Sequence, residues 1–382
     1  MEHFILKYTW FILYYIFGFC GIFPCQRTEE GSRLKLTSTS QFWWKFFSTY
    51  FVIKLSFVLE NLYVFWFERS FEDINNLLMN EIAPKKTDKF AMTITFFTEI
   101  IIQIVGITNI RGFAKKLVQV QNHVNDHAKL NIGKIRQNVW KSYLQITITL
   151  SLFITAMCVT FVGITYQLKL SQMGTILHIV FTLIPILSMY LPMFYMYITY
   201  IEVTLVFENW CLTLSKIDTF IIDDVKHFLD GLRKVSKMYS PMLFWLISLL
   251  FFDLVVISYA CYAYCSDIYY KSPLDWLKIC LASGEILIVV YLVCMLYILC
   301  HKSEKMVQGV QILKLAIEDM YLSKSADCRY ICSRLDTFHG FKANGYFIVN
   351  HSLLTGMAAS FATFLVILIQ FSQSELNSVN QI

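Results

Sequence analysis

Long apolar stretches alternate with shorter polar and basic segments along most of the chain. A bilayer core about 30 Å thick needs about 20 apolar residues in one helix. Seven stretches meet that length, and we predict membrane-spanning helices at 42–67, 90–110, 139–167, 173–207, 242–266, 276–301 and 345–371. The stretch 173–207 exceeds one crossing, so it either tilts strongly or continues into water as a helix.

Three basic segments between these stretches carry apolar residues that alternate between spacings of three and four. Such a period places each set on one face of a helix. We therefore predict that the spanning helices continue below the membrane into a cytosolic helical bundle. The apolar faces pack within the chain or, in part, against other subunits. They are Phe113, Leu117, Val120 and Val124; Ile221, Val225, Phe228, Leu232 and Val235; and Met306, Val310, Leu313, Ile317 and Met320.

Composition supports an all-α integral membrane protein. Hydrophobic residues make up 57% of the 382 residues and charged residues only 15%, against about 25% charged in an average soluble domain. A soluble enzyme, a nucleic-acid-binding protein and a secreted disulfide scaffold are excluded on these grounds. Strands with the alternating pattern of a membrane β-barrel are not found in the sequence. Neither are nucleotide-binding or hydrolase motifs, so no enzymatic activity and no cofactor are expected.

Basic residues fall mainly on one side of the predicted spans. Of the 32 Lys and Arg residues, 22 lie in 1–41, 111–138, 208–241 and 302–344, and 6 lie in the connections on the other side. The positive-inside rule then places the N-terminus in the cytosol and the C-terminus outside. Residues 4–24 are a further apolar stretch, which we interpret as an interfacial helix; a signal peptide and an eighth span are the alternatives.

This topology divides the chain into five parts. We expect a cytosolic or interfacial segment first, then a six-helix transmembrane bundle with cytosolic extensions, then cytosolic anchor helices, a seventh spanning helix and an extracellular tail. Their predicted bounds are 1–41, 42–301, 302–344, 345–371 and 372–382.

Two acidic residues are predicted near mid-depth of adjacent antiparallel spans, Asp253 and Glu285. Charged groups in a bilayer are costly and often functional, so these two side chains either form buried hydrogen bonds or contribute to a ligand or ion path. Cys328 and Cys332 with His339 supply three candidate ligands without a fourth, a weak zinc pattern. We therefore predict no metal site.

The seventh stretch ends in a short motif. Thr363 and Phe364 precede five apolar residues, and Gln370 and Phe371 close the motif. This segment strongly resembles the seventh span of insect gustatory receptors, whose signature is Thr-Tyr, five hydrophobic residues and Gln-Phe. Phe364 stands where the family has Tyr. Further similarity lies in Gly345, Phe347, Leu353 and Leu354, and in Gly21-Ile22-Phe23-Pro24, which is similar to the family's Gly-Leu-Phe-Pro.

The resemblance implies a ligand-gated, non-selective cation channel that detects a tastant and depolarises a chemosensory neuron. It also implies a homotetramer, or a heterotetramer with other gustatory receptors, in the plasma membrane of the dendrite. One seventh span per subunit would line the pore, and the ligand pocket would lie in the outer half of each bundle. Sugar-receptor relatives usually carry Glu where this chain has Leu365, which favours bitter-type or other tastants and leaves fructose open.

Two other classes of membrane protein compete with this interpretation. A G-protein-coupled receptor also has seven spans, but its N-terminus lies outside, opposite to the charge distribution here. Its Asp-Arg-Tyr and Asn-Pro-x-x-Tyr motifs are absent from the sequence. A small-solute transporter would show internal repeats and broken helices, and the sequence contains no repeat.

Candidate site residues follow from the spacing of the motif and from the aromatic content of the outer half. Positions three and four apart share one helix face, so the predicted pore and gate residues are Thr363, Phe364, Ile367, Gln370 and Phe371. Aromatic rings suit stacking on tastant rings, and short outer loops leave the pocket among the spans. The candidate ligand residues are Phe97, Tyr166, His178, Phe181, Tyr259, Tyr262 and Trp276. Anchoring at the lipid interface is the alternative role of these aromatic residues.

Overall fold

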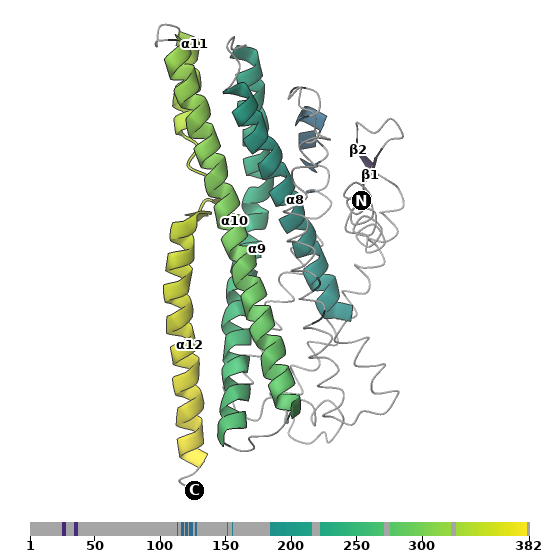
Figure 1. The fold of residues 1–382 in the computed structure, drawn as a ribbon, viewed down its shortest axis with the longest axis vertical. Coiled ribbons are helices and arrows are strands. Elements are labelled where there is room, and N and C mark those ends of the chain that lie inside the picture. Colours follow the sequence, from purple (N-terminus) through teal and green to yellow (C-terminus); the bar gives the residue numbers. More distant parts are fainter. Residues whose placement is uncertain are drawn as a thin grey trace.

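The chain was analysed as a computed structural model, which describes residues 184–215, 222–270, 276–321 and 326–379, together with 25–27, 34–36 and isolated positions between 113 and 155. Five helices dominate this part of the chain (Figure 1). They are α8 (Ile184–Leu214), α9 (Ile222–Tyr270), α10 (Trp276–Tyr321), α11 (Ala326–Asp336) and α12 (His351–Val379). Two short antiparallel pairs accompany them, β1 (Cys25–Arg27) with β2 (Leu34–Leu36) and β3 (Lys342–Ala343) with β4 (Phe347–Ile348).

Helices α9 and α10 run side by side over almost the whole height of the molecule (Figure 1). At 1.5 Å per residue, the 49 residues of α9 span about 74 Å, more than twice the hydrocarbon thickness of a bilayer. Helix α10 is also continuous, from Trp276 to Tyr321, so the predicted boundary at residue 301 falls inside it. Length and composition allow three of the described helices to cross a membrane, over Ile222–Tyr262, Ala282–Asp319 and His351–Ser374.

The three apolar stripes predicted from the sequence are buried within the chain, as expected for a helical bundle. Phe228, Val235, Met306 and Leu313 show no exposed surface, and the remaining described members are at most 5% exposed. Ile221 and the side chain of Met320 lie outside the described residues. The predicted packing of these helices on one another is thus confirmed for the segments that the structure describes.

Aromatic rings join the helices at the centre of this bundle. Tyr200 of α8 lies edge-on to Tyr239 of α9 at 5.3 Å and to Phe341 at 5.4 Å between ring centroids. Phe113 packs edge-on against Tyr239 at 5.4 Å. Edge-to-face pairs of this kind add to the stabilisation from apolar burial. The connection between α11 and α12 is thereby tied into the same core as α8 and α9.

A β-hairpin occupies the beginning of the predicted seventh span. The expected helix 345–371 starts six residues later, at His351, and continues to Val379 through most of the expected tail. Asn344 and Gly345 adopt positive φ angles of 49° and 80°, which a right-handed helix does not allow. Asn344 N donates to both the carbonyl oxygen and Oγ of Ser240, at 3.0 Å each, beside Pro241, which lies within α9.

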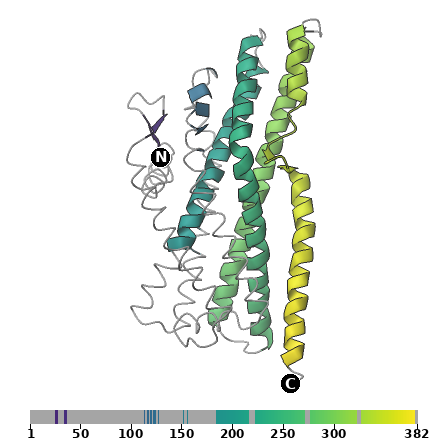
Figure 2. The ribbon, with the colours of Figure 1, turned by 180° about the vertical axis from the view of Figure 1, so that it is seen from behind.

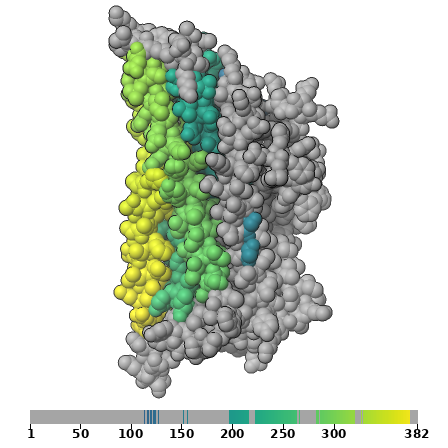
Figure 3. All heavy atoms as spheres, in the orientation of Figure 1, coloured from purple at the N-terminus to yellow at the C-terminus, as the bar shows by residue number. Residues whose placement is uncertain are grey.

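Helix α12 lies along the outside of the bundle. Both ribbon views show it beside α9 and α10, with the C-terminus at its far end (Figures 1 and 2). The space-filling view shows its side chains along one edge of the molecule (Figure 3). None of the residues in its most apolar stretch is buried within the chain, whereas 56% of the residues in the corresponding stretch of Ile222–Tyr262 are buried. An apolar helix that its own chain covers only on one side must contact lipid or other subunits on the other.

Candidate functional site

The predicted gate residues all lie on exposed positions of α12. Phe364 is 51% exposed, Ile367 40% and Phe371 62%, and Thr363 and Gln370 are exposed as well. Thr363 Oγ1 donates to the carbonyl oxygen of Ala359 at 3.0 Å, which satisfies its hydroxyl within the helix. The structure thus brings these five residues together on a surface that the rest of the chain leaves open.

Two contacts hold the C-terminal half of α12 against α9. The ring of Phe364 lies edge-on to Phe251 at 6.2 Å between centroids. Gln373 Nε2 donates to the Tyr262 hydroxyl at 3.4 Å, and Ser372 is 3% exposed. The end of the helix that carries the predicted gate is therefore linked to α9 through a residue predicted to bind ligand.

The predicted ligand pocket is described only in part. Tyr259 and Tyr262 share one face of α9 with ring centroids 6.5 Å apart, and Tyr259 is 3% exposed. Trp276 is the first residue of α10, but its side chain is outside the described part. Four candidates lie outside the described residues: Phe97, Tyr166, His178 and Phe181.

Of the two acidic residues predicted to lie within the membrane, the structure describes the side chain of one. Asp253 lies on α9 and is 5% exposed, so its carboxyl group is within the packed part of the bundle. Glu285 lies on α10, and its side chain is outside the described residues.

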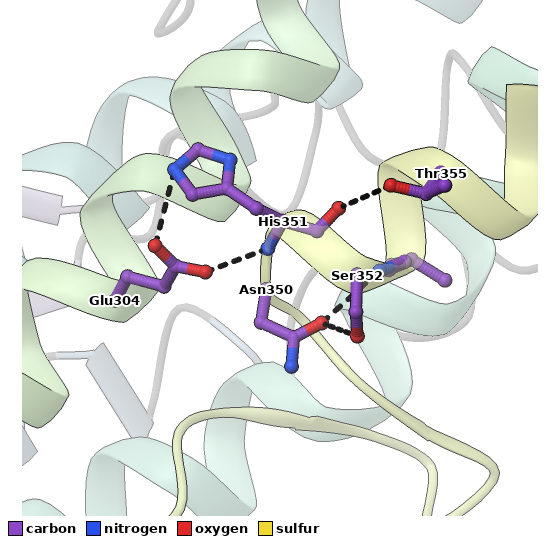
Figure 4. Close-up of polar contacts among 6 residues, drawn as sticks. Glu304, Asn350, His351, Ser352 and Thr355 are labelled. Atoms are coloured by element: carbon purple, nitrogen blue, oxygen red, sulfur yellow. Dashed lines mark hydrogen bonds and ion pairs between the residues drawn. The ribbon is translucent and has the colours of Figure 1, made fainter.

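The N-terminal end of α12 is fixed by polar contacts that the sequence pattern did not reveal (Figure 4). Asn350 caps the helix because its Oδ1 accepts the Leu353 N–H at 3.1 Å and the Ser352 hydroxyl at 2.8 Å. Glu304 of α10 accepts the His351 N–H through Oε1 at 2.8 Å, and its Oε2 lies 3.1 Å from His351 Nε2. In the sequence, an Asn before an apolar run is a signal for a helix cap. The contact of His351 with Glu304, 47 residues away in the chain, has no such signal.

No three His, Cys, Asp or Glu side chains are arranged to hold a metal ion in the part of the chain that the structure describes. Cys328 and Cys332 lie on α11, and His339 follows that helix. Burial, with a smaller effect of Glu318, raises the pKa of the Cys332 thiol.

Comparisons with known proteins agree with the fold. The chain matches the 7tm chemosensory receptor family over residues 11–375. It is similar to the insect olfactory receptor OR5 from Machilis hrabei in complex with eugenol, with a TM-score of 0.65 and 14% identity over 96% of this chain and 97% of that one. The similarity to a second OR5 structure has a TM-score of 0.57 and 15% identity, over 94% and 96% of the two chains.

No curated protein matches the chain significantly in sequence. The family match nevertheless covers most of its length, and three of the described helices are long and apolar enough to span a membrane. The chain is therefore an all-α, multi-pass membrane protein that belongs to the 7tm chemosensory receptor family.

Proposed function

We propose that the protein is a gustatory receptor that acts as a ligand-gated, non-selective cation channel. In this proposal four subunits, identical or mixed with other gustatory receptors, surround a central pore lined by their α12 helices. Binding of a small-molecule tastant opens the pore and depolarises the dendrite of a chemosensory neuron. The motif from Thr363 to Phe371 and membership of the chemosensory receptor family support this assignment.

The observation that carries the proposal is that the rest of the chain covers the α12 helix only on one side. None of the residues in its most apolar stretch is buried within the chain. Polar groups such as the Gln370 amide are costly in lipid, yet this residue is exposed. One helix does not enclose a pore, so a ring of subunits is required, most simply a symmetric tetramer. Within such a ring the exposed polar positions would face water or neighbouring subunits rather than hydrocarbon.

The ligand site of the proposal lies in the outer half of the bundle, around Tyr259 and Tyr262. Their adjacent rings offer an apolar surface with hydroxyl groups at its edge. In OR5 from Machilis hrabei, the bound molecule is eugenol, a small aromatic compound. For this chain we propose a small tastant of bitter or other type, with fructose included among the candidates.

Whole-cell recording from cells that express this chain alone tests the proposal. A panel of bitter compounds, fructose and small aromatic compounds should include one that evokes a cation current. That current should persist with a G-protein inhibitor in the recording pipette. Native mass spectrometry of the purified chain should show four copies. A monomer, or a ligand response that disappears with the inhibitor, would contradict the channel.

A further inference from the structure

Two neighbouring residues of α10 hold both ends of the segment that leads into α12. Ser303 shows no exposed surface, and its Oγ accepts the Phe341 N–H at 3.3 Å, just before the β3–β4 hairpin. Glu304 accepts the His351 N–H at 2.8 Å, just after the hairpin, and contacts the His351 ring at 3.1 Å. A shift of α10 at this level is therefore passed directly to the first turn of α12 (Figure 4).

Aromatic and imidazole rings surround this attachment. Tyr297, His301 and Glu304 follow one face of α10 at the spacing of four and three residues. Tyr297 stacks on His301 at 5.7 Å with an interplanar angle of 7°, and it lies 5.5 Å from His351. The His301 and His351 rings are 6.0 Å apart. Two titratable rings thus lie beside a single carboxylate at the start of α12.

The two side chains at the contact are only partly buried within the chain. The side chains of His351 and Glu304 are 38% and 34% exposed. Lys302 and Lys305 of α10 also act on His301, and Lys302 faces Glu208 of α8. Among the described residues, the electrostatic partners of His301 come from α10 and α12. By the predicted topology, the part of α10 around residue 304 lies at the cytosolic face of the membrane.

We propose that Glu304 is the positioning residue that couples α12 to the cytosolic helices, and that His351 makes this coupling sensitive to cytosolic protons. This inference rests on the proposed channel function. Imidazole changes its charge between about pH 5 and 8. A proton on His351 turns its contact with Glu304 into a charge-assisted bond, which is shorter and stronger than a neutral one.

The direction of the effect follows from how unevenly α12 is attached. Its inner end carries the Glu304 contacts and the Asn350 cap, whereas its outer end carries the long Gln373–Tyr262 hydrogen bond. A helix transmits bundle movement to its more loosely held end only while its firmly attached end stays in place. A tighter Glu304–His351 contact therefore makes ligand binding more effective in opening the pore.

Inside-out patches with controlled cytosolic pH test this coupling. Lowering the pH from 7.4 to 6.2 should reduce the half-maximal ligand concentration of the parent channel by at least about twofold, which corresponds to a modest gain in one charge-assisted bond. Glu304→Gln retains two hydrogen-bonding atoms and should respond to ligand without the pH shift. His351→Gln should lose the shift as well. The matched control, His301→Gln, removes a neighbouring imidazole but leaves Glu304 unchanged. This variant should keep the pH shift.

A second measurement does not depend on current. Hydrogen exchange of the purified full chain should show greater protection of the His351 amide at pH 6.2 than at pH 7.4, after correction for the intrinsic rate. Glu304→Gln should remove this difference. A parent channel without a pH shift, a shift that survives in His351→Gln, or protection that is equal at both pH values would overturn the coupling. A chain that gives no current at any pH but shows the protection difference would instead contradict the channel proposal.

Discussion

The ring of Phe207 on α8 fills the space that Gly231 leaves open on α9. A Cβ atom at Gly231 would lie 3.1 Å from Phe207 Cζ and 3.1 Å from His123 Cδ2, closer than ordinary contacts allow. Phe207 also packs on Phe228 at 5.8 Å between ring centroids. The close approach of α8, α9 and the segment around His123 thus depends on the missing side chain.

Gly231→Ala should destabilise the bundle because the new methyl group must displace two rings. Overpacking of this kind costs about 1–3 kcal/mol. The midpoint of thermal unfolding of the purified protein should fall by a few degrees. Gly309→Ala is the matched control, since its Cβ would meet Cys211 Cβ at an ordinary 3.6 Å. Equal melting temperatures for the two variants would show that the contact at Gly231 relaxes without cost.

Two leucines of α10 test whether the predicted apolar stripe stabilises the fold. Leu313 has no exposed surface, whereas Leu315, two residues further, is 58% exposed. Leu313→Ala removes buried methyl groups and should cost about 2–5 kcal/mol. Leu315→Ala makes the same chemical change outside the core and should leave the melting temperature of the dissociated chain nearly unchanged. Equal losses in both variants would mean that the stripe is not the core of this segment.

The sequence predicted these stripes because a period of three and four residues is a local property that needs no tertiary information. It placed Phe228 and Leu313 on buried faces correctly. It did not predict the β3–β4 hairpin, whose positive φ angles at Asn344 and Gly345 leave only a weak trace in composition. Pairings such as Glu304 with His351, or Tyr262 with Gln373, join residues far apart in the chain. Periodicity carries no signal for such pairs.

An epitope tag after Ile382 should be stained on intact cells. The predicted topology places this end outside because basic residues concentrate on the opposite side of the spans. A second tag, inserted at 322–325 between α10 and α11, should be stained only after permeabilisation. Reversed staining of the two tags would overturn the orientation and, with it, the cytosolic position of α11.

Alanine substitutions in the proposed ligand pocket should raise the half-maximal ligand concentration. Tyr259 and Tyr262 are the described candidates, and Tyr262→Phe separates two roles of one side chain. The Phe variant keeps the ring and loses only the hydroxyl that accepts from Gln373. If the Tyr262 ring stacks on the ligand, Tyr262→Ala should bind the ligand more weakly than Tyr262→Phe. Parental responses from all three variants, measured at equal surface expression, would place the pocket elsewhere.

The final prediction concerns the outer end of α12. In a ring of four subunits, Phe371 and Ile367 would narrow the closed path and exclude water, and Gln370 would help replace ion hydration when the ring widens. Nothing in the described part of the chain covers these positions extensively, since Phe371 is 62% and Ile367 40% exposed.

Phe371→Ala should therefore raise the ligand-free current, because the closed constriction loses its ring. Gln370→Ala should change the relative permeability of cations, read from reversal potentials in the same voltage-clamp experiment. Phe361→Ala is the matched control: this residue lies on the same helix but packs against the core, so its loss should leave selectivity unchanged. Because Phe361 supports the packing of α12, surface expression must be compared first. If Phe371→Ala and Gln370→Ala both reach the surface, respond to ligand and keep parental leak and selectivity, the gate does not lie at this end of α12, and the pore assignment fails with it.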